Sequence, residues 1–223
     1  MAGEELPRWL LAPVLLALTL LFLSLSAAGW DGWAALLADP ARATFVVISL
    51  AATVIALLSP LSVSTGKRED ASNRWILLPG MVVPLMAAWA VAYLDRRDRW
   101  VVDGETVRWV GVAILLAGCL LRIWPMFVLG RRFSALVAIQ QGHTLVTDGP
   151  YRWVRNPSYL GALLGGLGWT LVFRSVPGLM VVALSTWLII VRIDAEEALL
   201  ASEFGDEYDT YRRRTWRIVP WVY

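Results

Sequence analysis

The sequence predicts an all-α fold: a polytopic transmembrane helical bundle of five to six crossings, followed by a C-terminal cytoplasmic amphipathic helix. The 223 residues are 58% hydrophobic, with a mean hydropathy of +0.60, which is more apolar than an ordinary soluble domain. Much of this apolar content lies in runs close to the roughly 20 residues that a helix needs to cross a bilayer. The chain also contains 13 tryptophans, a residue that favours the membrane–water interface. We therefore expect a multi-pass integral membrane protein.

Six apolar segments are predicted to cross the membrane. They lie at about 9–28, 43–63, 75–94, 107–129, 158–173 and 176–191. The first approaches a full span and has no clear small-residue cleavage site after it, so we interpret it as a retained helix rather than a signal peptide. Pro79 and Pro84 predict that the third segment is kinked or begins late.

The last two segments are each a little short for an upright span, and a polar junction with Arg174 and Pro177 separates them. We therefore expect a tight helical hairpin that crosses the membrane and returns. The fifth segment also carries small residues that permit close helix packing. These are Gly161, Gly165, Gly166 and Gly168.

The tail at 194–214 has the pattern of a different kind of helix. Its apolar residues recur at helical spacing, with acids and arginines on the other faces. The apolar positions are Ala195, Leu199, Leu200, Phe204, Tyr208 and Tyr211. This pattern predicts a helix that lies on the membrane surface or caps the bundle.

Basic residues are divided unequally between the two sides of the predicted bundle. With six crossings, thirteen of the 20 Lys and Arg residues fall on the side of the two termini, six fall on the other side, and Arg122 lies within the fourth span. Because Lys and Arg are enriched in cytoplasmic loops, we expect both termini and the polar stretch at 142–161 to be cytoplasmic.

The composition argues against several functions. A net charge of only +2 gives no bulk case for nucleic-acid binding. The single cysteine, Cys119, excludes an internal disulfide and a multi-cysteine zinc site. With one histidine as well, a metal would have to be held almost entirely by carboxylates, so we assign no metal ligands.

The candidate active site is the stretch GHTLVTDGPYRWVRNPSYLG at 142–161, which is polar and irregular between two hydrophobic regions. Membrane proteins place such backbone beside their spans where protein or a water-filled cavity receives it. Gly149-Pro150 and Asn156-Pro157 are turn dipeptides. Since proline disfavours the α conformation of the residue before it, a new helix is expected to begin near Ser158.

Three groups of residues on the predicted cytoplasmic side are candidates for chemistry. They are His143 with Tyr151, Arg155, Asn156 and Tyr159; the pair Glu196 and Glu197; and Arg122. Each has a structural alternative. A lone loop histidine is usually solvated, the two acids suit the first turn of a helix, and the tyrosines suit interfacial anchors. An arginine near the end of a span can snorkel to the headgroups, although ionisable residues within spans are functional hypotheses by default.

Taken together, these groups match a charged cofactor that contains a nucleoside. Arginines can clamp a carboxylate, a glutamate can accept hydrogen bonds from ribose hydroxyls, and aromatic rings can hold a purine or a cation. S-adenosylmethionine has all of these parts. Methyl transfer from it needs orientation and charge complementarity more than a metal or a covalent nucleophile.

The order of motifs in the C-terminal half is also informative. LRIWP at 121–125, LGRRFS at 129–134 and the stretch at 142–161 are followed by Glu196-Glu197, Leu200, Phe204, Gly205, Tyr208 and Tyr211. This series resembles the isoprenylcysteine carboxyl methyltransferase family. That family and the related phospholipid methyltransferases share a histidine, a Gly-x-Tyr, an Arg-His-Pro-x-Tyr-x-Gly and a later Glu-Glu. The resemblance covers about 121–217 and does not extend to the first three spans.

The resemblance implies an S-adenosylmethionine pocket. It assigns to that pocket His143, Gly149, Tyr151, Asn156, Pro157 and Glu197, with Arg155 and Glu196 completing the polar wall and Leu145, Val146 and Tyr159 from the same stretch. Asn156 departs from the family pattern, which often has histidine there. Asparagine keeps the hydrogen bonding but cannot act as a titratable base, so a mechanism that needs a histidine base at this position fails for this chain.

The predicted activity is methyl transfer to a lipidic acceptor that enters from the bilayer, with a carboxylate on a prenylated thioether as the first substrate class. Arg155 or Arg122 would pair with that carboxylate, and Arg155 is favoured because it lies within the motif. Residues 1–105 would form N-terminal transmembrane helices, the candidate region for substrate specificity, and residues 106–223 the methyltransferase core. Three alternatives stay open: a phospholipid amine N-methyltransferase, an NADPH-dependent membrane reductase of the sterol type, and a non-enzymatic membrane scaffold.

Overall fold

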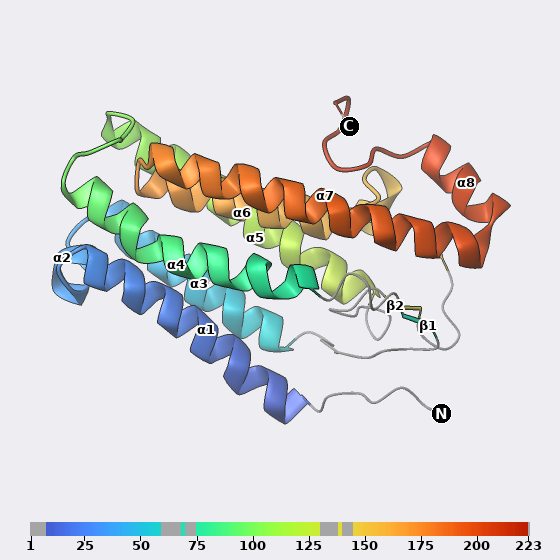
Figure 1. The fold of residues 1–223 in the computed structure, drawn as a ribbon, viewed down its shortest axis with the longest axis horizontal. Helices are drawn as coiled ribbons and strands as arrows, with labels where there is room; N and C mark the ends of the chain where they lie inside the picture. Colours follow the sequence, from blue (N-terminus) through green and yellow to red (C-terminus); the bar gives the residue numbers. More distant parts are fainter. Residues whose placement is uncertain (1–7, 59–67, 70–74, 130–137, 140–144, 223) are drawn as a thin grey trace.

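The computed structural model describes residues 8–58, 68–69, 75–129, 138–139 and 145–222. Six of the described helices run side by side along the long axis of the molecule (Figure 1). They are α1 (Arg8–Gly29), α3 (Pro40–Leu58), α4 (Leu77–Arg96), α5 (Glu105–Leu129), α6 (Pro157–Val172) and α7 (Val176–Phe204). This arrangement confirms the predicted all-α bundle.

Five of these helices are long and apolar enough to cross a membrane, namely α1, α3, α4, α5 and α7. The remaining one, α6, has 16 residues and is therefore about 24 Å long. It lies between α5 and α7 and returns the chain across the bundle, so that α6 and α7 form the expected hairpin (Figure 1). Five helices have membrane length, and α6 crosses the bundle as a sixth, shorter helix. This agrees with the predicted five to six crossings.

The connections between the helices gather at two ends of the bundle (Figure 1). One of them, which we call the site end, holds the 3₁₀ helix η3 (Gly149–Arg152), the helix α8 (Asp206–Arg213) and two strands. The strands, β1 (Arg68–Glu69) and β2 (Ala138–Ile139), pair antiparallel over two residues each. The opposite end holds α2 (Trp33–Leu37), the α4–α5 connection and the α6–α7 turn.

The tail differs most from the sequence prediction. The sixth span was expected to end near residue 191 and a separate helix to begin at 194, but α7 continues without interruption for 29 residues to Phe204. The stretch between them contains no glycine or proline, so nothing ends the helix before Gly205, which has a φ of +50°. The amphipathic tail helix is therefore only α8. Because α7 is about 44 Å long and the hydrocarbon core is about 30 Å thick, part of α7 extends beyond that core.

Other boundaries agree to within a few residues. The helix α4 begins late, at Leu77, and contains Pro84, as the prolines predicted. The helix α3 begins at Pro40, three positions before the expected start, because proline is well suited to the first position of a helix. The expected end of this second span, at 59–63, lies outside the described residues.

Glycines allow α5 and α6 to pack with their backbones in contact, as the sequence predicted. A Cβ on Gly118 of α5 would lie 2.4 Å from the backbone nitrogen of Gly165, and one on Gly161 of α6 would lie 2.4 Å from that of Arg122. A Cβ on Gly168 would meet the backbone nitrogen of Leu115 at the same distance. No side chain larger than hydrogen fits at these positions, so the glycines fix how α6 lies against α5.

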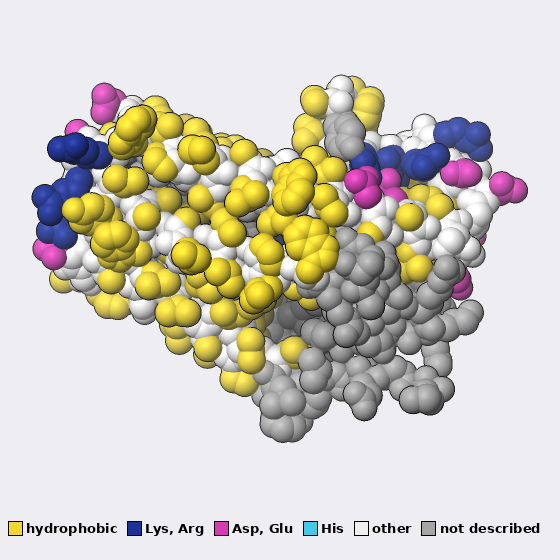
Figure 2. Space-filling model, in the orientation of Figure 1, with side chains coloured by type: hydrophobic (Ala, Val, Ile, Leu, Met, Phe, Trp, Pro, Cys, Tyr) yellow, Lys and Arg dark blue, Asp and Glu magenta, His cyan; other side chains and the backbone are white. Residues whose placement is uncertain are grey.

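The outer surface has the pattern of a membrane protein. Figure 2 shows hydrophobic side chains over the length of the visible bundle, whereas Lys, Arg, Asp and Glu gather at its two ends. Large apolar side chains are exposed along the helices, such as Met86 of α4 at 75% and Met180 of α7 at 74%. A soluble protein rarely exposes so large an apolar surface, whereas lipid tails would cover it.

At the opposite end, a buried ion cluster ties three elements together. Asp95, near the end of α4, is 2% exposed. It accepts two hydrogen bonds from Arg108 of α5, at 2.7 and 2.9 Å, and one of 2.8 Å from the Nε of Arg174 in the α6–α7 turn. Arg108 also donates to the carbonyl oxygen of Val172 at 2.6 Å. The cluster closes this end of the bundle, away from the candidate site.

Candidate active site

The predicted motif folds as a tight turn followed by a helix start. Gly149 begins η3 with a φ of +59°, and a Cβ there would lie 3.2 Å from a methyl group of Val128 on α5. Glycine therefore permits both the backbone conformation and the close approach. Asn156 is not helical (φ −122°, ψ 53°), and Pro157 is the first residue of α6. The helix start expected near Ser158 is thus confirmed.

A cavity of about 720 Å³ opens beside the motif and extends between the helices, a volume typical of small-molecule sites. The polar side chains that line it at the end nearest the motif are Arg122, Tyr151, Arg155, Asn156, Ser158, Tyr159, Arg192, Glu196, Tyr208 and Tyr211, and Thr53 and Ser185 add two further hydroxyls. Most of its other lining side chains are apolar and come from α1, α3, α4, α5, α6 and α7. The cavity therefore joins a polar compartment at the site end to an apolar compartment inside the bundle.

One face of α7 follows the cavity from its apolar part to its polar part. Residues at steps of three and four share one side of a helix. The lining residues that follow this spacing are Val181, Ser185, Leu188, Arg192, Glu196 and Leu199. The uninterrupted course of α7 thus carries an arginine and a carboxylate into the same cavity that its apolar residues line.

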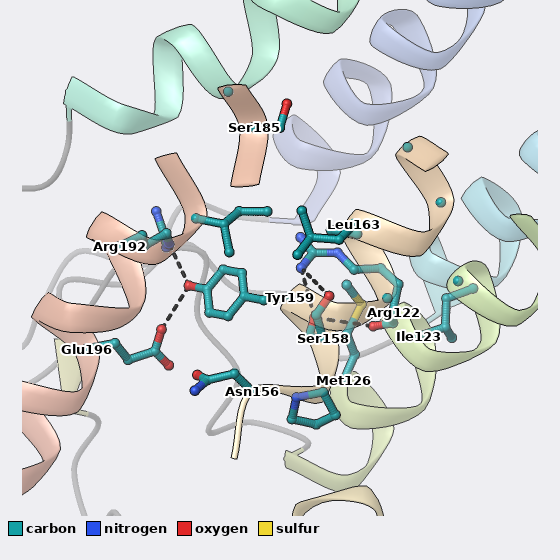
Figure 3. Close-up of a pocket in the computed structure, with 18 of the residues that line it drawn as sticks. Arg122, Ile123, Met126, Asn156, Ser158, Tyr159, Leu163, Ser185, Arg192 and Glu196 are labelled. Carbon is teal, nitrogen blue, oxygen red and sulfur yellow. Dashed lines mark hydrogen bonds between the residues drawn. The ribbon is translucent and has the colours of Figure 1, made fainter. Parts of the chain in front are cut away.

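Tyr159 of α6 links these two charged side chains (Figure 3). The Nε of Arg192 donates to the Tyr159 hydroxyl oxygen at 2.6 Å, and this hydroxyl donates to an Oε of Glu196 at 2.8 Å. Since the arginine can only donate, the tyrosine proton is directed toward the glutamate. The relay holds the Glu196 carboxylate in place.

Arg122 of α5 enters the cavity from another side. It donates to the Oγ of Ser158 at 2.8 Å and to the carbonyl oxygen of Ser158 at 3.3 Å (Figure 3). Both acceptors are neutral, and among the described residues no carboxylate forms an ion pair with Arg122. This guanidinium is therefore a cation in a largely enclosed cavity, with its charge left for an anion to neutralise.

Glu197 lies outside the cavity lining, in a network behind the motif. One of its carboxylate oxygens accepts hydrogen bonds from the Nε of Arg155 at 3.1 Å and from the side-chain amide of Asn156 at 3.0 Å. The other lies 3.3 Å from the Nε of Arg217. The side chains of Glu197 and Arg155 are only 11% and 10% exposed. This carboxylate therefore fixes two motif residues from behind.

A segment close to the C-terminus, which we call the C-terminal strap (residues 214–218), crosses the motif. The backbone amide of Arg155 donates to the carbonyl oxygen of Trp216 at 2.8 Å. The backbone amide of Trp216 in turn donates to the carbonyl oxygen of Trp153 at 2.9 Å. An Nη of Arg155 also donates to the carbonyl oxygen of Thr215 at 2.5 Å. Side-chain and backbone contacts thus attach the strap to the motif, about sixty residues earlier in the chain.

Three tyrosines supply uncharged polar groups to the cavity. Burial raises the pKa of Tyr151, Tyr208 and Tyr211 above the ordinary value for tyrosine, and the negative charge of Glu196 raises those of Tyr151 and Tyr208 further. The Tyr211 hydroxyl donates to the carbonyl oxygen of Tyr151 at 2.8 Å, whereas the buried Tyr208 hydroxyl has no partner among the described residues. All three stay protonated at neutral pH.

The cavity gathers most of the residues that the sequence predicted for the site. Those that line it are Arg122, Leu145, Val146, Tyr151, Arg155, Asn156, Pro157, Tyr159 and Glu196. Gly149 instead packs against α5, and Glu197 lies in the network described above. His143 lies outside the described residues. Their roles in binding or catalysis stay predictions.

Sequence reasoning assigned no site role to Arg192, Ser158, Tyr208 or Tyr211, which all line the cavity. A signal for Arg192 was present, because it precedes Glu196 by four positions and such pairs share a helix face. The prediction that the span ended near residue 191 hid that relation. Among the described residues, no three His, Cys, Asp or Glu side chains are grouped to hold a metal ion.

Comparison with known proteins gives this geometry a family context. Residues 109–202 match the isoprenylcysteine carboxyl methyltransferase (ICMT) family. Over this segment, which is about two fifths of the chain, the chain is similar to that family. The family segment begins in α5 and ends in α7, so it contains Arg122, the motif and Glu196, and it confirms the resemblance that the sequence indicated.

The similar proteins are themselves named for this activity. A protein-S-isoprenylcysteine O-methyltransferase of Schizosaccharomyces pombe is 36% identical over 114 residues, which cover 50% of this chain and 48% of the relative. That of Tribolium castaneum is 25% identical over 175 residues, 75% of this chain and 59% of the relative. The chain thus spans about half the length of these curated relatives. A solved structure of a eukaryotic intramembrane Ras methyltransferase of this family aligns over 81% of this chain and 77% of its own, at 18% identity and a TM-score of 0.48.

Proposed function

We propose that this protein is an integral membrane S-adenosylmethionine-dependent methyltransferase that methylates a carboxylate on a lipidic acceptor of the isoprenylcysteine type. The observation that carries the proposal is the single cavity that joins a polar compartment to an apolar one. An acceptor with a charged head and a long apolar tail fits such a cavity, and it can enter from the bilayer. The family assignment of residues 109–202 supports the same reaction class.

The polar compartment fits the proposed cofactor. The Glu196 carboxylate, held by Tyr159, can accept hydrogen bonds from ribose hydroxyls or face a cationic group, and Asn156 and Tyr151 offer neutral hydrogen-bonding groups beside it. The buried Tyr208 hydroxyl supplies a further donor. When bound, S-adenosylmethionine supplies a methyl group on a positively charged sulfur. In this proposal His143, Leu145, Val146 and Pro157 contribute to the pocket as the sequence predicted, Gly149 forms the turn beside it, and Glu197 acts by holding Arg155 and Asn156.

Arg122 is the better candidate to hold the acceptor carboxylate, although the sequence favoured Arg155. Arg155 already contacts Glu197 and the strap carbonyls, whereas Arg122 has only the neutral Ser158 as a described partner. A planar guanidinium can grip a carboxylate with two parallel hydrogen bonds. Arg122 lies in α5 where the polar and apolar compartments meet, so it can hold the head of an acceptor whose tail lies in the bundle.

The side chains around the cavity favour a carboxylate acceptor over an amine. An ionised carboxylate loses no proton on methylation, whereas a protonated amine needs a base. Asn156 does not titrate near neutrality, and the raised pKa of Tyr151 keeps that phenol neutral. Glu196 is the one carboxylate among the described lining residues, and one of its oxygens already accepts a hydrogen bond from Tyr159. The protein would work by positioning the reactants and excluding water.

We further propose that the site end faces the cytoplasm. The basic residues counted for that side include Arg152, Arg155 and Arg192, and the structure supports their grouping at one end. Helices of the predicted N-terminal region, 1–105, contribute Leu15, Ala52, Met81 and other apolar residues to the cavity wall. This placement supports a role of that region in recognising the acceptor tail.

The deciding experiment combines binding and turnover in purified protein reconstituted into lipid nanodiscs. Calorimetry should detect S-adenosylmethionine binding and no NADPH binding. Binding of NADPH alone would favour a membrane reductase, and binding of neither cofactor would favour a non-enzymatic membrane scaffold. A prenylated cysteine with a free carboxylate should be methylated at a rate that changes little between mildly acidic and mildly basic pH. Arg122→Lys should lower that rate about a hundredfold, the cost of removing one well-placed donor, with unchanged cofactor affinity. Equal turnover by the variant would refute the clamp, and methylation of lipid amines alone would refute the carboxylate acceptor.

A further inference from the structure

The last described residues, which overlap the C-terminal strap at 216–218, expose a small cluster of large apolar side chains. Trp221 is 84% exposed and Val222 is 78% exposed, while Trp216 and Val219 are about two-fifths exposed, at 41% and 39%. The rings of Trp216 and Trp221 lie 6.4 Å apart. Ile218, between them, is buried at 3% and fixes the segment to the protein. The cluster, which we call the C-terminal apolar tip (residues 216–222), is therefore presented outward by an ordered support.

The apolar tip is continuous with the lipid-facing surface of the bundle. Trp124, near the end of α5, is 47% exposed and its ring nitrogen lies 3.9 Å from the position of a Cβ on Gly149. The turn that begins at Gly149 leads to Trp153, which is 56% exposed, and the Trp153 carbonyl accepts the backbone amide of Trp216. These contacts place three exposed tryptophans, Trp124, Trp153 and Trp216, on neighbouring segments between a membrane-length helix and the tip, and we call them the row of indoles.

The tip also lies at the level where a bilayer surface would be. In Figure 2 the C-terminal hydrophobic side chains stand out where the apolar surface of the bundle gives way to Lys, Arg, Asp and Glu at the site end. Indole rings concentrate at this boundary in membrane proteins because one part of the ring is apolar and the other is polar. The nearby exposed residues Arg152, Arg213 and Arg214 can approach anionic headgroups.

We propose that the C-terminal apolar tip is an interfacial membrane anchor whose occupant is the headgroup region of the lipid bilayer. This inference goes beyond the proposed methyltransferase function and does not depend on it. The continuity of the tip with the row of indoles, its level on the bundle and the neighbouring arginines all favour lipid over a second copy of the chain or a soluble partner. In water, such a cluster would remain an unfavourable exposed surface.

The anchor has a structural consequence for the site. The strap that leads to the tip supplies backbone acceptors to Arg155 and Asn156, and Arg217 within it lies against Glu197. A tip seated in the bilayer holds this strap across the motif. The membrane itself would therefore help to order the polar wall of the cavity, and loss of the tip should loosen the strap without changing the transmembrane helices.

Depth-dependent fluorescence quenching tests the anchor directly. Val222→Cys is introduced into a Cys119→Ser background and labelled with an environment-sensitive fluorophore. The labelled protein is studied in two kinds of phosphatidylcholine vesicle, in which the lipid chains carry bromine either near the headgroup or near the chain ends. Leu184→Cys, which is 44% exposed on α7, serves as a control within the membrane, and Thr210→Cys on the exposed surface of α8 serves as one in water. We expect the Val222 label to be quenched most by shallow bromines and the Leu184 label by deep ones. If the Val222 label is quenched as little as the Thr210 label, the anchor is wrong. The anchor is also wrong if brominated lipids leave the Val222 label unquenched and only a quencher attached to a second copy of the chain quenches it.

Hydrogen exchange tests the coupling to the strap. In vesicles, Trp221→Ser should speed exchange of the Trp216 backbone amide by about fivefold, which corresponds to about 1 kcal/mol, the scale of half-burying a large apolar side chain. The matched control is Trp100→Ser, since Trp100 is 73% exposed at the opposite end. The control should leave the Trp216 amide unchanged. Equal exchange in the wild type and Trp221→Ser would show that the tip does not hold the strap.

Discussion

The adjacent acids Glu196 and Glu197 should respond in opposite ways to the same substitution. Glu197 accepts hydrogen bonds from Arg155 and Asn156 and pairs with Arg217 in a nearly buried network. Glu197→Gln keeps the shape of the side chain and one acceptor but removes the charge that offsets two guanidinium groups. Breaking a buried pair in this way costs about 3–5 kcal/mol. Because one acceptor survives, we expect the free energy of unfolding to fall by about 3 kcal/mol.

Glu196→Gln changes the same chemistry one residue earlier, on the face that lines the cavity. Its amide oxygen can still accept from Tyr159, so stability should change by less than about 1 kcal/mol. Affinity for S-adenosylmethionine should fall by about 1.5–3 kcal/mol, the scale of a hydrogen bond to a charged group. Unfolding in mixed detergent–dodecyl sulfate micelles without cofactor measures the first quantity, and calorimetry measures the second. If Glu197→Gln abolishes binding while stability stays unchanged, Glu197 contacts the cofactor and the division of roles is wrong.

Three further predictions concern packing, the opposite end and orientation. Gly118→Ala should cost about 3 kcal/mol or more of stability, because its Cβ would lie 2.4 Å from a backbone nitrogen. Gly165→Ala, with open space at the Cβ position, should be neutral or stabilising by up to about 1 kcal/mol. If thermal unfolding shows equal losses of stability for the two variants, the backbone contact is contradicted. Asp95→Asn should destabilise by about 3–5 kcal/mol because it leaves the buried Arg108 without its carboxylate and removes one of the two carboxylates that pair with Arg174, yet cofactor affinity measured by calorimetry should not change. Single cysteines at Asp103 and Thr210, introduced into Cys119→Ser protein, should be labelled by an impermeant reagent in intact cells only at Asp103, and labelling at Thr210 would reverse the proposed orientation.

Local sequence was enough to predict the bundle and the turn at its site. Apolar runs near bilayer length determine that a segment will be helical in a membrane, because the backbone must satisfy its own hydrogen bonds there. Gly149-Pro150 and Asn156-Pro157 likewise predict a turn and a helix start, since their backbone limits hold in any environment. Gly161 and Gly168 predicted that the fifth segment packs closely against another helix, because a missing side chain is a local property, and the structure shows that this helix is α5.

Only the tertiary structure decided which side chains of the motif meet in the cavity. Neighbouring residues on a helix point about 100° apart, so the phase of α7 against α6 determines that Glu196 lines the cavity while Glu197 binds Arg155 behind it. That phase depends on the packing of the whole bundle, which no single segment encodes. The strap that holds Arg155 comes from about sixty residues later in the chain, so the sequence near Arg155 gives no sign that its guanidinium is already bound. Arg122 has only neutral described partners and is therefore the arginine left to bind an anion.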